Sequence, residues 1–151
     1  MMKNVPRWPR LLGLAGLLPQ LAAVLAAFLG PEEWNEPARA IGALYAALIF
    51  TFLGGTWWGI AAGAPAAERR GGLAWAWVAA VLPSLITFGL VGAWMVDMVP
   101  LEPVLVMLGA GLLVALAVDA RLGSLSPRWW MQLRVPLSAI LGSVTIALAL
   151  A

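Results

Sequence analysis

Long apolar runs alternate with short polar segments along the whole chain. Each of five runs is close to the roughly 20 residues that a membrane-spanning helix needs. None has a charged residue in its middle, and they cover residues 11–29, 40–62, 73–95, 99–118 and 135–151. The pattern therefore predicts an all-α membrane protein, a bundle of five transmembrane helices that forms a single integral membrane domain over residues 1–151.

Composition supports membrane spans over the two other interpretations, a cleaved signal peptide at residues 11–29 and a soluble helical bundle. The chain is 63% hydrophobic and only 11% charged, whereas soluble domains carry roughly 25% charged residues. The first run has 19 residues, which is longer than the apolar region of a typical signal peptide. Apolar residues also surround whole helix circumferences, unlike the one-sided pattern of soluble amphipathic helices. We therefore expect all five runs to be retained spans.

Several kinds of chemistry lose their usual residues in this chain. It contains no cysteine and no histidine, which removes thiolate metal sites, the commonest metal ligand and the Ser-His-Asp constellation. No Asp, Glu, Lys or Arg lies at the centre of a run, and such residues usually mark proton and ion pathways. We expect no metal and no cofactor, and on balance no enzyme.

The charged residues separate into two groups along the chain. Eight of the nine cations lie in alternate polar segments, and only Arg39 lies in the others; the eight are Lys3, Arg7, Arg10, Arg69, Arg70, Arg121, Arg128 and Arg134. Cytoplasmic loops of membrane proteins carry the Lys and Arg excess. We therefore expect a cytoplasmic N-terminus and a periplasmic C-terminus in a multi-pass protein of the bacterial inner membrane. The cations are explained by topology, so we expect no nucleic-acid partner.

The second run contains the unusual stretch FLGGTWWGIAAG at residues 52–63. Small residues spaced four apart allow helices to approach closely in lipid. We therefore expect a helix-packing seam along one face, with Gly54 beside it; the row consists of Thr51, Gly55, Gly59 and Gly63. Trp58 should border this seam, and Trp57 should face lipid or another neighbour. Pro19 and Pro83 lie inside runs and should kink their helices. Gln20 is one candidate partner for the carbonyls that the prolines leave free.

The last cytoplasmic segment holds the densest group of polar and aromatic residues. It begins with Asp119 and Arg121 and continues as SPRWWMQLR at residues 126–134. Pro127 can open a short helix that lies along the interface and turns into the last span at Arg134. We expect Asp119 to contact Arg134 or Arg121. A possible docking face for anionic lipid headgroups or a partner protein consists of Trp58, Asp119, Arg121, Arg128, Trp129, Trp130 and Arg134.

Four stretches together resemble the transmembrane protein 69-like family, whose defining domain has no known function. They read LGLAGLLP at 12–19, YAALIFTFLGGTWWG at 45–59, LPSL at 82–85, and Asp119 with SPRWWMQLRVPLS at 126–138. The sequence departs from the family pattern at Trp57 and Gln20. The resemblance implies a small multi-spanning protein of bacterial inner membranes with mitochondrial relatives, and it supplies no activity.

Three functions fit these observations. The first is an accessory, structural or assembly subunit of a larger respiratory or photosynthetic membrane complex, which suits the short loops and scarce reactive groups. The second is a carrier that binds a small solute, a lipid or a quinone. The third is a lipid-headgroup enzyme in which Asp119 is the acid or base and the arginines hold phosphate. We expect membrane lipids, including anionic headgroups at the cytoplasmic face, and membrane proteins as partners.

Overall fold

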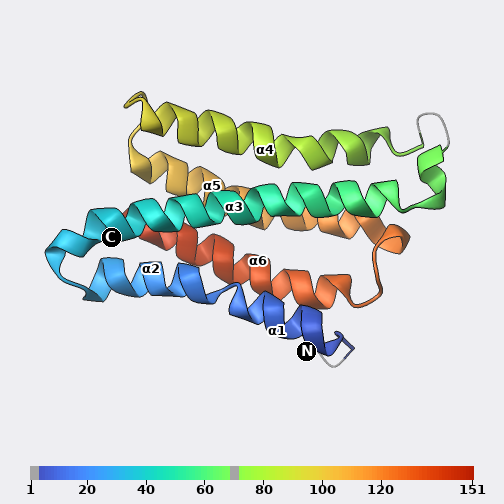
Figure 1. Ribbon diagram of the computed structural model, residues 1–151, viewed down its shortest axis with the longest axis horizontal. Helices are drawn as coiled ribbons and strands as arrows, with labels where there is room; N and C mark the ends of the chain where they lie inside the picture. Colours follow the sequence, from blue (N-terminus) through green and yellow to red (C-terminus); the bar gives the residue numbers. More distant parts are fainter. Residues whose placement is uncertain (1–3, 69–71) are drawn as a thin grey trace.

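The computed structural model describes residues 4–68 and 72–151, so the cations Lys3, Arg69 and Arg70 lie outside the described chain. The described ranges contain six α-helices and no β-strand: α1 (Arg7–Ala15), α2 (Leu18–Leu29), α3 (Asn35–Ala62), α4 (Ala74–Met95), α5 (Leu101–Leu122) and α6 (Trp130–Ala147). Four short 3-10 helices join or end them: η1 (Glu32–Trp34), η2 (Pro65–Glu68), η3 (Gly123–Leu125) and η4 (Leu148–Leu150). In Figure 1, α3 runs along the middle, with α4 on one side and α2 and α6 on the other.

All five predicted runs form helices long and apolar enough to cross a membrane, which confirms the all-helical, five-span architecture. Several boundaries differ from prediction: α1 begins at Arg7, α3 at Asn35 and α6 at Trp130, and α5 ends at Leu122. The expected interfacial helix at residues 126–134 is therefore wrong. The chain turns at Pro127, whose carbonyl accepts the Trp130 N–H at 2.8 Å, and the last span begins there.

The first span is broken between α1 and α2 rather than bent at Pro19. Pro19 lies in the first turn of α2, where its missing N–H is tolerated. The carbonyl of Gly16 at the break accepts a hydrogen bond of 2.6 Å from the Tyr45 hydroxyl on α3. Gln20 does not take this role; it is fully buried and donates to Thr145 on α6 at 2.9 Å.

Of the residues expected to form a packing seam on α3, Gly54 lies against another helix, whereas Gly55 and Gly59 contact no other described helix. A Cβ placed at Gly55 or Gly59 would meet nothing within 4 Å, whereas one at Gly54 would collide with the Ala80 carbonyl on α4. The side of α3 that contacts α4 carries Gly54 instead of the row. Of the other two members, Thr51 donates its hydroxyl to its own helix at 2.8 Å, and Gly63 ends α3.

Helices α5 and α6 cross closely at a pair of glycines. A Cβ at Gly109 would lie 2.7 Å from the Gly142 carbonyl oxygen, and one at Gly142 would lie 2.8 Å from the Gly109 carbonyl oxygen. Leucines of α5 pack around this crossing, and Leu105, Leu108 and Leu112 are fully buried. The close approach holds α6 firmly against α5 and fixes which α6 side chains face the interior.

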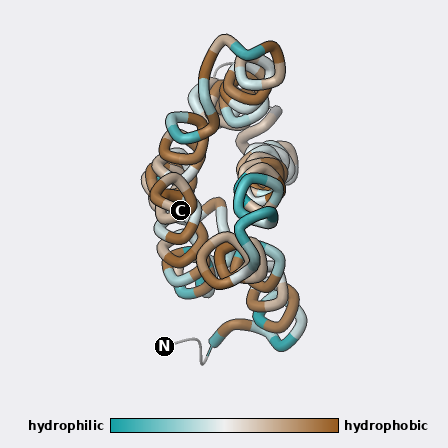
Figure 2. Tube along the Cα trace, turned by 90° about the vertical axis from the view of Figure 1, so that its left-hand side faces the viewer, coloured by the Kyte–Doolittle hydropathy of each residue, from teal (hydrophilic) through white to brown (hydrophobic). Residues whose placement is uncertain are grey.

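The two ends of the bundle carry different charges. Helix α1 begins at one end and the C-terminus lies at the other (Figure 1). We call the first the basic end, because four arginines lie there: Arg7, Arg10, Arg121 and Arg128. The opposite end, which we call the acidic end, holds four carboxylates: Glu32, Glu33, Glu36 and Asp97. It also holds the ion pair of Arg39 with Glu102 at 2.6 Å. Figure 2, which looks nearly along the helices, shows that hydrophobic residues dominate the trace and hydrophilic ones form short stretches.

Candidate functional site

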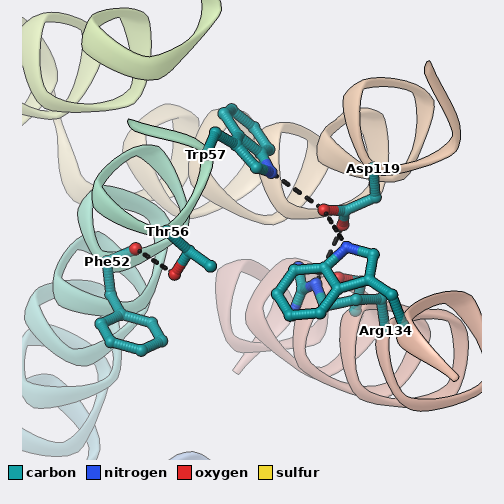
Figure 3. Close-up of polar contacts among 7 residues, drawn as sticks. Phe52, Thr56, Trp57, Asp119 and Arg134 are labelled. Atoms are coloured by element: carbon teal, nitrogen blue, oxygen red, sulfur yellow. Dashed lines mark hydrogen bonds and ion pairs between the residues drawn. The ribbon is translucent and has the colours of Figure 1, made fainter. Parts of the chain in front are cut away.

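A buried polar cluster joins three helices near the basic end. Asp119, in the last turn of α5, is fully buried. Its Oδ1 atom accepts hydrogen bonds from the indole N–H groups of Trp57 on α3 and Trp130 on α6, both at 2.9 Å. Its Oδ2 atom accepts one from Arg134 Nε at 2.9 Å, as Figure 3 shows. The carboxylate thus ties α3, α5 and α6 together at one point.

Arg134 is the cationic member of this cluster. Its side chain is only 7% exposed, and a buried charge is stable only when paired and hydrogen-bonded. Besides Asp119 it contacts Ser138, whose Oγ accepts from Nη2 at 2.8 Å. The remaining terminal nitrogen, Nη1, makes no hydrogen bond to any residue that the structure describes. One donor group of the guanidinium is therefore available.

The expected contact between Asp119 and Arg134 is confirmed, and Arg121 is not the partner. Arg121 is exposed, and its guanidinium lies 4.7 Å from the ring centroid of Trp75 on α4. Residues 130, 134 and 138 are spaced four apart and so occupy one face of α6. The tight turn after α5, where Gly123 has a φ of +50°, reverses the chain and brings this face against Asp119.

The two adjacent tryptophans contact different helices. Trp57 is buried and binds Asp119, whereas Trp58 is 49% exposed and packs edge-on against Trp77 at 4.7 Å between ring centroids. A buried indole N–H needs an acceptor. Asp119 directly follows the predicted span 99–118 and lies near the same end of the bundle as Trp57. This acidic residue was the signal in the sequence that could have identified the acceptor for the Trp57 indole.

The predicted docking residues do not form one surface. Asp119, Trp130 and Arg134 belong to the internal cluster, and Trp129 lies half-buried beside it. The other three are exposed at separate places: Trp58 on Trp77, Arg121 on Trp75, and Arg128 in the turn before α6. Asp119 and Arg134 therefore do not belong to a headgroup-binding surface, because both are buried, and docking at the exposed residues stays a prediction.

An apolar cavity of about 320 Å³ lies between α1, α3 and α6, against the polar cluster. Its walls include Leu12 and Gly13 of α1, Phe52 and Thr56 of α3, and Trp130 and Arg134 of α6. The Thr56 hydroxyl donates to the Phe52 carbonyl at 2.9 Å, so it offers only its oxygen to the cavity. Figure 3 shows Thr56 and Phe52 on one side and Arg134 on the other. The arrangement combines an apolar interior with one cationic donor.

The cavity opens sideways, toward the surroundings of the bundle. Leu12 and Phe52 line it and are also 67% and 68% exposed, so they form its rim. Helix α1 packs against α6 and has few contacts with α3, which leaves the opening between α1 and α3. In a membrane this rim would face lipid.

Comparison with known proteins gives one result that covers almost the whole chain. No curated protein and no solved structure matches it. The sequence profile of a family described as a protein of unknown function, DUF3429, matches residues 5–150. That range includes every helix described above and all members of the Asp119 cluster. The chain therefore belongs to the DUF3429 family of proteins of unknown function.

Proposed function

We propose that this protein is a membrane-embedded binding protein for a hydrophobic or lipid-like molecule. The observation that carries the proposal is the apolar cavity of about 320 Å³ with the Arg134 guanidinium in its wall. Ligand sites are typically cavities of about 300–1,000 Å³ with apolar linings and a few polar groups that orient the ligand. The cavity fits the lower end of that range. Its opening between α1 and α3 suits entry from the lipid phase.

The proposed setting is the bacterial inner membrane, with the basic end toward the cytoplasm. The support is the excess of cations at that end, which is typical of cytoplasmic loops. The resemblance to the transmembrane protein 69-like family also belongs to this proposal, because that family is placed in such membranes. In this orientation the cavity extends from the cytoplasmic headgroup level into the hydrocarbon.

A cavity-filling variant tests the proposal. Thr56→Trp places an indole in the cavity, and Thr51→Trp makes the same change on the same helix outside it. Each variant and the wild-type chain would be purified in mild detergent, and bound hydrophobic molecules would be extracted and quantified by mass spectrometry. We expect a bound molecule with the wild-type chain and with Thr51→Trp, and its loss with Thr56→Trp. Equal recovery from all three proteins would contradict the proposal.

A second candidate function is the accessory or assembly subunit of a larger complex. The observation that favours it is the open face of α3, where a Cβ at Gly55 or Gly59 would meet nothing within 4 Å. Small residues on an uncovered helix face permit close approach of a helix from another protein. Gly59→Leu should then release the protein from a large complex on native gels of gently solubilised membranes. Unchanged migration would count against this role.

We do not propose a lipid-headgroup enzyme. Asp119 would have to act as its acid or base, yet it is fully buried and accepts three hydrogen bonds. A carboxylate held in this way is positioned to bind helices together and has no exposed oxygen to offer to a headgroup.

A further inference from the structure

We infer that the cavity selects a neutral, single-tailed molecule whose head carries a carbonyl oxygen, and that Arg134 Nη1 is the donor that recognises it. The inference rests on the proposed function, because it assumes that the cavity is occupied, and it adds the chemical class of the ligand. Three features carry it: the free donor, the charge balance of the cluster, and the size and depth of the cavity.

The free donor defines which kind of head group fits. Arg134 uses Nε for Asp119 and Nη2 for Ser138, and it lines the cavity. An arginine side chain has only donors, so the group facing Nη1 must be an acceptor. Three other residues of the cavity walls carry a polar side-chain group. The hydroxyl hydrogen of Thr56 is committed to Phe52 and the indole N–H of Trp130 to Asp119, and the indole of Trp129 can only donate. A ligand head with an accepting oxygen is therefore favoured over one that only donates.

Charge balance then favours a neutral acceptor over an anion. The carboxylate of Asp119 lies within hydrogen-bond distance of Arg134 and compensates its charge. A phosphate or carboxylate at Nη1 would leave one unpaired negative charge beside Asp119. Such a charge is costly in an interior where Arg134 is itself only 6% exposed. A carbonyl oxygen accepts the same hydrogen bond without adding charge.

The dimensions of the cavity favour one tail. Its α6 wall extends from Trp129 to Leu141, which at about 1.5 Å per helical residue is about 18 Å. Arg134 lies about one helical turn inside the Trp130 end. A volume of about 320 Å³ holds on the order of ten water-sized groups, at about 30 Å³ for each. That is room for a head and the first part of one chain, whose remainder would extend through the opening between α1 and α3, and too little for a two-chain lipid.

The competing arrangement places an anionic head outside the cavity. Arg128 lies exposed in the turn before α6, next to the cavity residues Trp129 and Trp130. A phosphate could sit there while its tail enters the cavity. The two arrangements depend on different arginines, so they can be separated by experiment.

Three single-tailed probes distinguish the chemistry of the head. Monooleoylglycerol and oleoyl lysophosphatidic acid have the same chain and differ by the phosphate, and a decyl-tailed benzoquinone tests a ring carbonyl in place of an ester carbonyl. Dissociation constants would be measured by native mass spectrometry on the full chain in detergent. We expect the two neutral probes to bind at least about tenfold more tightly than lysophosphatidic acid. The tighter of the two neutral probes identifies the source of the carbonyl.

Two matched variants identify the recognising arginine. Arg134→Lys keeps a cation near Asp119 but replaces the guanidinium, with its Nη1 group, by a single ammonium, and it should weaken binding of the neutral probes by about tenfold. Arg128→Lys should change it by less than about twofold, as expected for an exposed site. Equal or tighter binding of lysophosphatidic acid, or a larger effect at Arg128, would overturn the inference. If Arg134→Lys fails to fold, the probe comparison on the wild-type chain decides alone.

The same experiment separates this inference from the proposed function. If Thr56→Trp leaves the binding of every probe unchanged, the cavity is not the site and the proposed function fails. If Thr56→Trp abolishes binding but the anionic probe is preferred, the cavity binds ligands and only the inference about the head is wrong.

Discussion

Replacing Asp119 by asparagine should destabilise the protein severely, even though the shape of the side chain is nearly kept. An asparagine oxygen can still accept from the indole groups of Trp57 and Trp130, which lie 2.9 Å from Oδ1. The loss falls on Arg134, which is buried and paired with Oδ2 at 2.9 Å. Removing one partner of a buried ion pair costs about 3–5 kcal/mol, because the other charge stays buried without compensation. That is a large share of a typical stability of about 5–15 kcal/mol.

A double replacement separates the charge effect from the loss of contacts. Arg134→Gln alone should cost about as much as Asp119→Asn, since it leaves the carboxylate unpaired. Asp119→Asn combined with Arg134→Gln removes both charges and leaves acceptors for both indoles. The double variant should therefore be more stable than either single variant by about 2 kcal/mol. Reversing both charges, with Arg at 119 and Asp at 134, should restore less, because the two indole N–H groups would then face a cation.

The assay is equilibrium unfolding in mixed micelles of mild detergent and dodecyl sulfate, followed by circular dichroism. The matched control is Glu102→Gln, which breaks the ion pair with Arg39 at the acidic end; Glu102 is 49% exposed there, and such pairs contribute less than about 1 kcal/mol. A loss below about 1 kcal/mol for Asp119→Asn, or a double variant whose loss equals the sum of the two single losses, would refute the reasoning.

Three further predictions follow from packing and topology. Gly142→Ala should lower the free energy of unfolding by about 1–3 kcal/mol in the same assay, because it forces α5 and α6 apart. Gly59→Ala should leave it unchanged or raise it by up to about 1 kcal/mol. A loss of stability at both positions would contradict the packing described. Trp57→Phe should cost about 1.5–3 kcal/mol through the lost hydrogen bond to a carboxylate, and Trp58→Phe less than about 1 kcal/mol; equal losses would argue against it. Alkaline phosphatase fused after Ala151 should be active, because we expect that end in the periplasm, and an inactive but expressed fusion would show the opposite orientation.

The sequence could predict the spans because hydrophobic length alone determines them. It could also predict the pairing of Asp119 with Arg134, because opposite charges at similar depth in neighbouring spans gain by contact. Glycine spacing was a poorer guide. A row of small residues shows where another backbone can approach, but not which helix does so, and Gly55 and Gly59 remained uncovered while Gly54 met α4.

The internal cluster was missed because its members were assigned to separate features. Trp129 and Trp130 were interpreted as headgroup aromatics in an interfacial segment, which hid the helical spacing of residues 130, 134 and 138. For Trp57 the glycine row left two alternatives, lipid or another neighbour, and could not identify Asp119 as its partner. The two cases share one cause, since the partners of an indole N–H or a guanidinium lie on other helices and their positions depend on tertiary packing.

Arg134 belongs both to the cluster that holds the helices together and to the wall of the cavity, and this shared position links the two properties. A ligand that bonds to Nη1 binds only the packed arrangement in which Asp119 and Ser138 orient the guanidinium. The proposed ligand would therefore favour the assembled bundle, by about 2.7 kcal/mol at a free ligand concentration one hundred times the dissociation constant. The packed bundle would in turn favour binding. Asp119 fixes the direction of the guanidinium before any ligand arrives, so the entropic cost of ordering this side chain on binding is small. The neutrality of the pair explains why one buried arginine can serve both purposes. An uncompensated cation in this place would attract any anion or draw water into the bundle, whereas the paired one offers N–H donors in a fixed direction.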